Sequence, residues 1–489
     1  MAVFSGLTHT ASLRFDDTNH LVRNLPMREV NWDGIFYFWR HPTVGAYSPV
    51  TNSIWFLLTH LNVGVSAFYV ANLVVYSLSV MAAYFAMQPL IGSLIPLSLA
   101  TLWFALHPLH VEPVAWLTCL RDLLAGFFSL LSVGAYARYL SQKGNRFWYV
   151  AAFVAFLLAV LSKNTAFSLP LVLAAMGVFF FERSFREVFF HFLPWAISLP
   201  LLFLHADLHS PIAEALVTPV PWPARILVAL DAITFYLAKV ALPVNLSFDY
   251  GRSPQSLLAS QFLFLTPLIP ILLGLYFYKK RNERWGRRAM GGLLVFCGSA
   301  FMALGLKPFV FQHISTVADR YVFLSLFAPS LVLGIGASRS KRLCLALGVW
   351  CLFFAVLTFH EVQVWQDDVA LYQRIVVRNS RSWYGYSVLG SYFERAGDKE
   401  SAVASYQMSI KKMSEPIKRS ILCARLGTFF LEERRYADAV GVFTQALSLN
   451  PNFDFARENL NLAWSKIKID HMISPHETMR ALGKDKEGM

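Results

Sequence analysis

Apolar residues fill most of the chain up to about residue 362 in long windows that are separated by charged or proline-rich segments. An α-helix needs about 20 mostly apolar residues to cross the hydrocarbon core of a bilayer, and windows near this length predict about ten crossings. The windows are 65–88, 92–107, 122–140, 147–162, 164–181, 187–206, 258–278, 289–306, 321–337 and 343–361. An eleventh window, 224–243, carries Arg225, Asp231 and Lys239 on one stripe, so we expect an interfacial or re-entrant helix there. The pattern predicts an all-α, polytopic membrane domain over residues 65–362.

After residue 362 the pattern changes to amphipathic helices with polar surfaces, and a repeat appears. Leu389, Gly390, Phe393, Ala402 and Tyr406 recur as Leu426, Gly427, Phe430, Ala439 and Phe443, at an offset of 37 residues (427 − 390). The same alternation of small and large residues packs paired helices in tetratricopeptide repeats, and this segment resembles two of them. We expect residues 363–470 to form a short α-solenoid, which is more often a protein-docking surface than a catalytic one. Residues 471–489 are expected to form a polar tail.

Residues 1–64 precede the first clear crossing and contain no signal peptide with an apolar core of adequate length. Their acidic, aromatic and proline-punctuated segments suit short helices that lie at a membrane surface. We therefore interpret this stretch as an extracytoplasmic loop.

Composition supports membrane residence and excludes several classes of protein. Of the 489 residues, 56% are hydrophobic and 15% are charged, and the mean hydropathy is +0.47. A soluble domain of this length needs roughly a quarter of its residues charged, so a soluble enzyme is excluded. The five cysteines are scattered and lack CxxC spacing, so they indicate neither a zinc site nor a redox site.

The net charge of +13 is concentrated in the apolar part of the chain. Residues 1–362 hold 25 Lys and Arg against 15 Asp and Glu, whereas residues 363–489 hold 18 against 15. The densest basic run, from Lys279 to Arg288, lies between two apolar windows, which is typical of a cytoplasmic loop and not of a nucleic-acid site. We therefore expect no nucleic-acid partner.

The basic loops also orient the chain. One group of loops is expected on the cytoplasmic side because of its Lys and Arg: Arg138, Lys143 and Arg146; Arg183 and Arg186; Lys279 to Arg288; and Arg339, Lys341 and Arg342. Counting outward from these, a second group falls on the opposite side: residues 1–64, the 107–122 loop, Lys163, the 207–257 region, the 307–320 loop and everything after 362.

Candidate chemistry is concentrated on that opposite side. Asp16 and Asp17 are adjacent carboxylates that raise one another's proton affinity, which suits either a general base or a divalent cation, although a solvated acidic turn is the simpler alternative. His107, His110 and Glu112 lie in a loop before Arg121 and Asp122. Either these histidines anchor helix ends at the interface, or the loop lines a polar site.

Three cations are expected on the side of the acidic pair. Arg121, Lys163 and Arg320 would lie at one interfacial level, with Asp319 and Tyr321 beside the last of them. Lys163 either extends its amine to the interface or holds an anion there. Three cations facing a carboxylate pair suit a lipid-linked phosphate beside a general base.

Six segments in this order, followed by the helical repeats, carry a family resemblance. They are FDDTNHLVRN, YSPVTNSIWF, HPLHVEPVAWLTCLRDLLAG, LSKNTAFSLP, ADRYVFLSL, WQDDVALYQ and the repeats themselves. Together they resemble the transmembrane and tetratricopeptide-repeat O-mannosyltransferase family and its bacterial relatives, within the GT-C glycosyltransferases. The resemblance covers nearly the whole chain. It implies transfer of a sugar from a polyprenyl-phosphate carrier to a hydroxyl of a protein or glycan on the extracytoplasmic face.

The resemblance also implies roles for particular residues. Asp16 or Asp17 would be the catalytic base, and Arg121, Lys163 and Arg320 would bind the donor phosphate. His107, His110, Glu112, Asp122, Asp319 and Tyr321 would shape the sugar or acceptor pocket. The resemblance names no definite cofactor, and an optional divalent cation would use Asp16, Asp17, His110 and Glu112. Relatives have a transmembrane helix before the FDD loop, so either the start is assigned too late here or the chain lacks that helix.

The short repeat array resembles bacterial members, which implies a bacterial inner membrane with the repeats in the periplasm, or the endoplasmic reticulum membrane in a eukaryote. The expected partners are the polyprenyl-phosphate-linked sugar, membrane lipids and an acceptor protein at the repeat surface. The main alternative is a non-catalytic membrane scaffold for envelope assembly, whose repeats bind a protein. A transporter is a weaker alternative, because no crossing carries a carboxylate near its middle.

Overall fold

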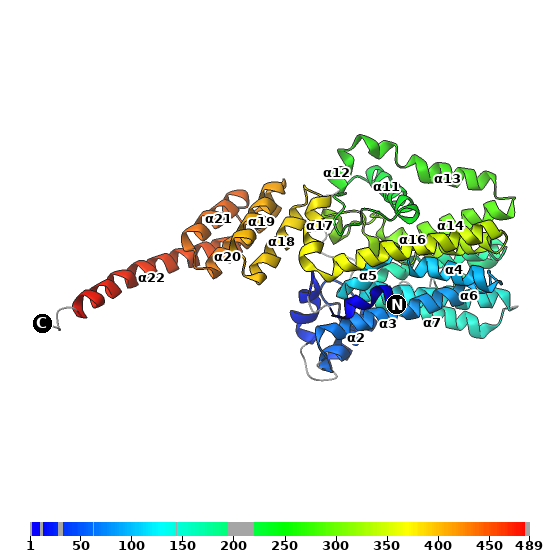
Figure 1. Ribbon diagram of the computed structural model, residues 1–489, viewed down its shortest axis with the longest axis horizontal. Helices are drawn as coiled ribbons and strands as arrows, with labels where there is room; N and C mark the ends of the chain where they lie inside the picture. Colours follow the sequence, from blue (N-terminus) through cyan, green and yellow to red (C-terminus); the bar gives the residue numbers. More distant parts are fainter. Residues whose placement is uncertain are drawn as a thin grey trace. The chain divides into compact units, whose positions relative to one another are not determined.

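The computed structural model describes residues 2–9, 13–27, 33–61, 63–142, 144–193, 195 and 220–484. Helices and loops account for these residues, and there is no β-strand among them, so the predicted all-α class is confirmed for this part of the chain. The chain divides into two compact units, Met1–Asp368 and Val369–Met489 (Figure 1).

The first unit contains long helices joined by short 3₁₀ and π turns. Its α-helices are α1 (Asp33–Arg40), α2 (Pro49–His60), α3 (Val65–Met87), α4 (Leu94–Ala105), α5 (Val111–Ala115), α6 (Leu120–Ser141), α7 (Arg146–Ser162), α8 (Leu169–Phe179), α11 (Trp222–Ala241), α12 (Pro254–Leu258), α13 (Leu268–Lys279), α14 (Arg284–Ala300), α15 (Phe327–Ala337) and α16 (Lys341–Gln366). Its short turns are η1 (Ala2–His9), η2 (Thr18–Val22), η3 (Leu25–Met27), η4 (Pro108–His110), η5 (Leu117–Cys119), η6 (Asn164–Ser168), η7 (Gln261–Phe264), η8 (Phe301–Ala303), η9 (Val310–His313) and η10 (Asp319–Val322). α6 packs between α3 and α7 (Figure 1). α15 packs against α14 and α16.

Four helical stretches in the described part of the chain are long and apolar enough to cross a membrane. They are α3, η5 with α6, η7 with α13, and α16. A fifth is counted if α4 and the η4–α5 segment form one span, which bends by 52° at the break before Pro108.

The structure does not show the ten crossings that the sequence predicts. α7, η6 with α8, and α15 are apolar, but each has 10–17 residues. At 1.5 Å per residue, 17 residues reach about 25 Å, which is less than the ~30 Å hydrocarbon core. An apolar window can pass over a helix break: the window 321–337 contains the turn between the end of η10 at Val322 and the start of α15 at Phe327. Much of the predicted window 187–206 and the first part of the 207–257 region, residues 207–219, lie outside the described residues.

α11 occupies the window expected to be interfacial or re-entrant, and its polar stripe is bonded within the protein. Asp231 is buried, pairs with Arg252 and accepts a hydrogen bond from the Thr266 hydroxyl at 2.7 Å. Lys239 donates to the carbonyl of Val244 at 2.6 Å. These contacts explain how charged residues are accommodated on a largely apolar helix.

The N-terminal segment is folded onto the start of α6. Short helices are present there, as the sequence predicts, in η1 to η3, α1 and α2. Phe38, Trp55 and Phe56 form one buried apolar cluster with Leu117 and Leu120. This cluster fixes the loop that carries Asp16 and Asp17 against the beginning of α6.

The second unit consists of six helices: α17 (Asp368–Arg378), α18 (Trp383–Ala396), α19 (Lys399–Lys412), α20 (Pro416–Glu432), α21 (Tyr436–Leu449) and α22 (Asp454–Lys484). α18 packs against α19, and α20 packs against α21. Gly390 lies against the ring of Tyr406, and Gly427 lies against the ring of Phe443. The small and large residues of the sequence repeat therefore meet across each helix pair.

The turns between the paired helices also correspond. Gly397 adopts a left-handed backbone with φ of +79° after α18, and Arg434 adopts φ of +59° after α20. The two positions are 37 residues apart (434 − 397), which is the offset of the repeat. Asp398 then caps α19 by accepting a hydrogen bond from the Ser401 amide at 3.0 Å.

Substitution of Gly427 by alanine tests the packing of the second helix pair. The added Cβ would lie 2.8 Å from two carbon atoms of the Phe443 ring, so we expect Gly427→Ala to destabilise this pair by about 1–2 kcal/mol. Hydrogen exchange of α20 and α21 in the full chain measures the effect. Gly441→Ala is the control, because no heavy atom lies within 4 Å of its new Cβ, and protection there should be unchanged or increased. Equal protection in the two variants would contradict the packing described above.

Candidate functional site

The acidic pair lies in a tight turn between η1 and η2. The amide of Asp17 donates to the carbonyl of Arg14 at 2.9 Å, and Phe15 between them has a left-handed backbone with φ of +49°. The ring of Phe15 stacks on Phe248 at 3.9 Å and meets the edge of Trp116 at 5.2 Å. Aromatic packing therefore holds a backbone conformation that is unfavourable for a residue other than glycine.

Asp17 is fully buried and joins the turn to the start of α6. One carboxylate oxygen accepts the Arg14 amide at 2.8 Å, and the other accepts the Thr118 amide at 3.1 Å. Burial raises the pKa of Asp17 to about 7, and the charge of Asp16 adds to this, although the two amide hydrogen bonds oppose the change. Asp17 is thus a positioning residue whose charge depends on pH near neutrality.

Asp16 differs from its neighbour because 41% of its side chain is exposed. One oxygen accepts the Thr118 hydroxyl at 2.9 Å, and the other lies 3.4 Å from Nε2 of His20. Burial of the surrounding loop would raise the pKa of Asp16, but His20, the charge of Arg121 and Thr118 together lower it to about 2. Asp16 is therefore the ionised and accessible member of the pair.

Arg121 is connected to the pair through His20. Its Nη2 lies 3.3 Å from Nε2 of His20, and its guanidinium lies 5.7 Å from the centre of the Trp55 ring. Burial and the charge of Arg121 lower the pKa of His20, which keeps this ring neutral at pH 7. In the described part of the chain, Arg121 has no carboxylate within ion-pair distance, and its Nε is buried without a hydrogen-bond partner. Arg121 is consequently able to accept an anion.

Lys163 and Arg320 both have carboxylate partners already. Lys163 pairs with Asp122 at 2.6 Å and lies 6.0 Å from the centre of the Tyr321 ring. Arg320 pairs with Glu112, and both side chains are almost completely buried. An incoming phosphate would have to compete with these carboxylates, and breaking a buried pair costs about 3–5 kcal/mol.

Asp319 and Tyr321 complete the surroundings of Arg320. The amide of Asp319 donates to Glu112 at 3.2 Å, and the Tyr250 hydroxyl donates to the Asp319 carboxylate at 2.6 Å. Nη2 of Arg320 donates to the Tyr321 hydroxyl at 3.3 Å. The guanidinium also lies over the rings of Trp116, Phe248, Phe311 and Tyr321. These contacts fix the guanidinium firmly in place.

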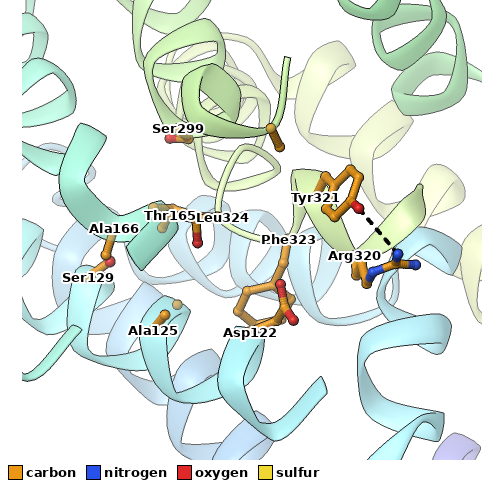
Figure 2. A pocket seen from close by; sticks show the side chains of 12 residues that line it. Asp122, Ala125, Ser129, Thr165, Ala166, Ser299, Arg320, Tyr321, Phe323 and Leu324 are labelled. Atoms are coloured by element: carbon orange, nitrogen blue, oxygen red, sulfur yellow. Dashed lines mark hydrogen bonds between the residues drawn. The ribbon is translucent and has the colours of Figure 1, made fainter. Parts of the chain in front are cut away.

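A cavity lies beside these residues and is lined by Asp122, Arg320 and Tyr321 (Figure 2). Its other walls include Gly126, Thr165 and Phe323. The cavity measures about 40 Å³. A buried water needs roughly 10–15 Å³ by the same measure, so the cavity holds a few waters and is too small for a sugar ring.

His107 and His110 lie outside the cavity wall and are completely buried. Nδ1 of His107 accepts the Leu109 amide at 3.3 Å, and its Nε2 lies 3.2 Å from the carbonyl of Val240. The two ring nitrogens of His110 lie 3.1 Å from the Tyr76 hydroxyl and 3.3 Å from the carbonyl of Phe323. In this conformation the geometry gives both histidines a packing role and does not place them in a sugar pocket.

The residues named for an optional divalent cation do not converge on one point. Within the described residues there is no group of three His, Cys, Asp or Glu side chains that could hold a metal ion. The oxygens of Asp17 accept amide hydrogens, Glu112 pairs with Arg320, and the nitrogens of His110 are engaged. These residues do not fit a metal site as they stand.

The remaining predicted residues form a connected set of contacts. Thr118 joins Asp16 to Asp17, and His20 joins Asp16 to Arg121. Asp122, which follows Arg121 in the chain, forms an ion pair with Lys163. Tyr321 contacts both Lys163, through its ring, and Arg320, through its hydroxyl. The sequence reasoning missed His20 and Thr118. A signal existed for His20, because it follows Asp16 by four residues, which is one helical turn.

Comparison of the chain with protein-family models, curated proteins and solved structures gives no match.

The buried carboxyl of Asp17 predicts a pH-dependent stability. The pKa of Asp17 is raised from 3.8 to about 7 in the fold, so its contribution to stability is greatest below about pH 4 and is lost as the pH rises to about 7. Between about pH 5 and pH 8 this term should lower the free energy of unfolding by roughly 3 kcal/mol in the wild type and by nothing in Asp17→Asn. Thermal unfolding in detergent across this range measures the difference between the two proteins.

Asp16→Asn is the control for this experiment. Asp16 has a pKa of about 2 and is ionised throughout the range, and its charge raises the pKa of Asp17. The Asp16→Asn protein should therefore still lose stability as the pH rises, but it should do so at a lower pH than the wild type. If the stability of the wild type instead rises with pH relative to Asp17→Asn, the amide hydrogen bonds outweigh burial and the direction assigned to Asp17 is wrong.

Proposed function

We propose that the chain is an integral membrane glycosyltransferase of the GT-C type, which transfers a sugar from a polyprenyl-phosphate carrier to a hydroxyl of a protein or glycan. The observation that carries the proposal is the pair Asp16 and Asp17, whose environments separate their pKa values to about 2 and about 7. Two carboxyls with separated pKa values are typical of acid–base sites. The order of the six sequence motifs and the repeats that follow them supports the same assignment.

The membrane part of the proposal is supported by helices of sufficient length. Four stretches, or five with the bent pair, are long and apolar enough to cross a bilayer. The proposal adds crossings by some of the shorter apolar helices, packed against the long ones. It also places Asp16 and Arg121 on the extracytoplasmic side, in a bacterial inner membrane or in the endoplasmic reticulum.

In the proposed reaction, Asp16 acts as the base. The acceptor hydroxyl attacks the anomeric carbon of the donor, its proton passes to Asp16, and the bond from that carbon to the phosphate oxygen breaks. The phosphate leaves as an anion and is bound by Arg121, so no acid is needed. Inversion at the anomeric carbon follows from attack on the face opposite the phosphate.

A pKa of about 2 is low for a base, and donor binding offers a way to change it. The charge of Arg121 contributes to the lowering of the Asp16 pKa. A phosphate bound to Arg121 would offset that charge, so the pKa of Asp16 would rise toward the range in which a carboxylate accepts a proton. Substrate binding would therefore activate the base.

Donor binding also requires the site to open. The cavity is too small for a sugar, and Asp122 and Glu112 neutralise two of the three cations assigned to the phosphate. The Lys163–Asp122 pair is the more exposed of the two, so it is the pair expected to separate, which would give the phosphate a second cation. Arg320 would remain paired and hold the wall of the site.

The second unit suits a docking role. Its paired helices repeat the same packing and the same turn position, as in tetratricopeptide repeats, and such solenoids bind proteins along extended surfaces. In the proposal this unit recruits the acceptor protein. The same repeats favour a second candidate function, a membrane-anchored scaffold for envelope assembly that has no catalytic activity.

Asp16→Asn should abolish transfer while leaving the protein folded. The loss of a positioned general base typically lowers a rate by roughly 10²–10⁴-fold. The measurement is mass spectrometry of envelope glycans and glycoproteins from cells that carry the wild type, the variant or no protein. Arg121→Gln should lower transfer to a similar extent, and Asp438→Asn, on the second unit, is the control.

Two results would distinguish the alternatives. If Asp16→Asn and Arg121→Gln support the same glycan pattern as the wild type, the assignments of the base and the phosphate ligand are wrong. If those two substitutions have no effect on the glycans, while substitution of Arg395, Lys399 or Arg434 prevents complex formation, the scaffold function is favoured.

A further inference from the structure

Basic residues gather at the end of the first unit that lies farthest from the acidic pair. α14 has Ser299 at the cavity and Arg284 at its other end, 15 residues away, which is roughly 22 Å along the helix. α6 likewise begins beside Asp16 and ends beyond Arg138. The cluster of cations is therefore a separate feature from the candidate catalytic site.

Close packing of helices brings three turns together at this end. α14 packs against both α8 and α15. A Cβ on Gly291 would lie 2.5 Å from the Cβ of Phe179, and a Cβ on Gly292 would lie 2.6 Å from the side chain of Val332. Because no side chain separates these helices, the turn after α8, the turn before α14 and the turn between α15 and α16 are neighbours.

The acidic residues of these turns are already paired. Glu182 pairs with Arg287, Glu187 lies 3.5 Å from Arg183, and Glu283 lies 2.7 Å from Lys280. Several further cations have no carboxylate within ion-pair distance in the part of the chain that the structure describes, and five of them concern the first turns of α14 and α16. These five are Arg284, Arg288, Arg339, Lys341 and Arg342.

The unpaired cations repel one another and also oppose two helix dipoles. Arg339, Arg287 and Arg284 all act on Arg288 through their charges. Arg284 is the first residue of α14, and Lys341 and Arg342 are the first two residues of α16. Cations at the positive end of a helix are unfavourable, typically by 0.3–1 kcal/mol each, whereas an anion there is favourable. An external anion would offset both the repulsion among the cations and their unfavourable interaction with the two helix dipoles.

The surroundings of the cluster indicate what carries that anion. Trp285 is 45% exposed and Tyr278 is 52% exposed beside the basic turn. Immediately beyond the cations on α16, Leu345 and Leu352 are more than 70% exposed. A nucleic acid or an acidic protein would match the cations but not the adjoining aliphatic surface. A lipid with an anionic headgroup matches the cations, the interfacial aromatic rings and the aliphatic surface together.

We propose that Arg284, Arg288 and Arg339, together with the first turns of α14 and α16, bind the phosphate headgroup of an anionic phospholipid. The site lies in the leaflet opposite the acidic pair. It does not depend on the transfer reaction, so it stands or falls independently of the proposed function.

The test compares the full-length wild type with Arg284→Gln/Arg288→Gln/Arg339→Gln in two kinds of vesicle. One is pure phosphatidylcholine, and the other is an equal mixture of phosphatidylcholine and phosphatidylglycerol. Each cation near an anionic leaflet is worth roughly fivefold in partitioning, so retention of phosphatidylglycerol through purification should fall by at least tenfold in the variant. Native mass spectrometry of the purified protein measures the retained lipid. Lys411→Gln/Lys412→Gln/Lys466→Gln removes the same charge from the second unit and should retain phosphatidylglycerol as the wild type does.

Thermal unfolding in the same vesicles separates a lipid site from a general loss of folding. The wild type should unfold at a higher temperature in the mixed vesicles than in phosphatidylcholine. In phosphatidylcholine alone the triple variant should equal or exceed the wild type, because removing like charges relieves repulsion. Equal retention of phosphatidylglycerol by the wild type and the triple variant would overturn the proposal. Stabilisation of the wild type by inorganic phosphate as strongly as by the mixed vesicles would also overturn it, because the site would then bind phosphate without a lipid.

Discussion

The candidate site depends on two hydrogen bonds that the Asp17 carboxylate accepts, one from the Arg14 amide and one from the Thr118 amide. They join the N-terminal turn to the beginning of α6, two segments about 100 residues apart in the chain. Because both bonds are buried, neither can be exchanged for bonds to water without unfolding the turn. The turn attached in this way carries Phe15, which aromatic packing holds in its left-handed conformation, and the exposed Asp16.

Charge balance imposes the second constraint on the site. A buried charge needs a partner, and the residues that the structure describes supply carboxylates for Lys163 and Arg320 but none for Arg121. The three cations that look equivalent in the sequence are therefore different in space. In the proposed reaction Arg121 binds an anion directly, and Lys163 exchanges its partner Asp122 for that anion. Arg320 stays paired with Glu112 and holds the wall of the site.

The sequence predicted the helical class, and it singled out the acidic pair as a candidate, because both leave local signals. Asp16 and Asp17 are adjacent, and the repeat positions Gly390 and Gly427 record a helix contact that sterics demand. The number of long helices was overestimated because hydropathy does not detect a turn such as the one between η10 and α15, and because windows shorter than a full crossing were counted. The ion pairs of Arg320 and the burial of His110 depend on residues from distant segments, which no local pattern specifies.

The turn between α20 and α21 has a consequence for what holds these two helices together. Arg434 holds the left-handed conformation that Gly397 holds in the preceding pair, and a side chain there costs about 1–2 kcal/mol. The preceding turn also has the Asp398 cap, whereas Arg435 forms no side-chain cap before α21. The α20–α21 pair is therefore held together by its buried side chains, among them Phe430, Ala439 and Phe443, and not by the turn that joins its helices.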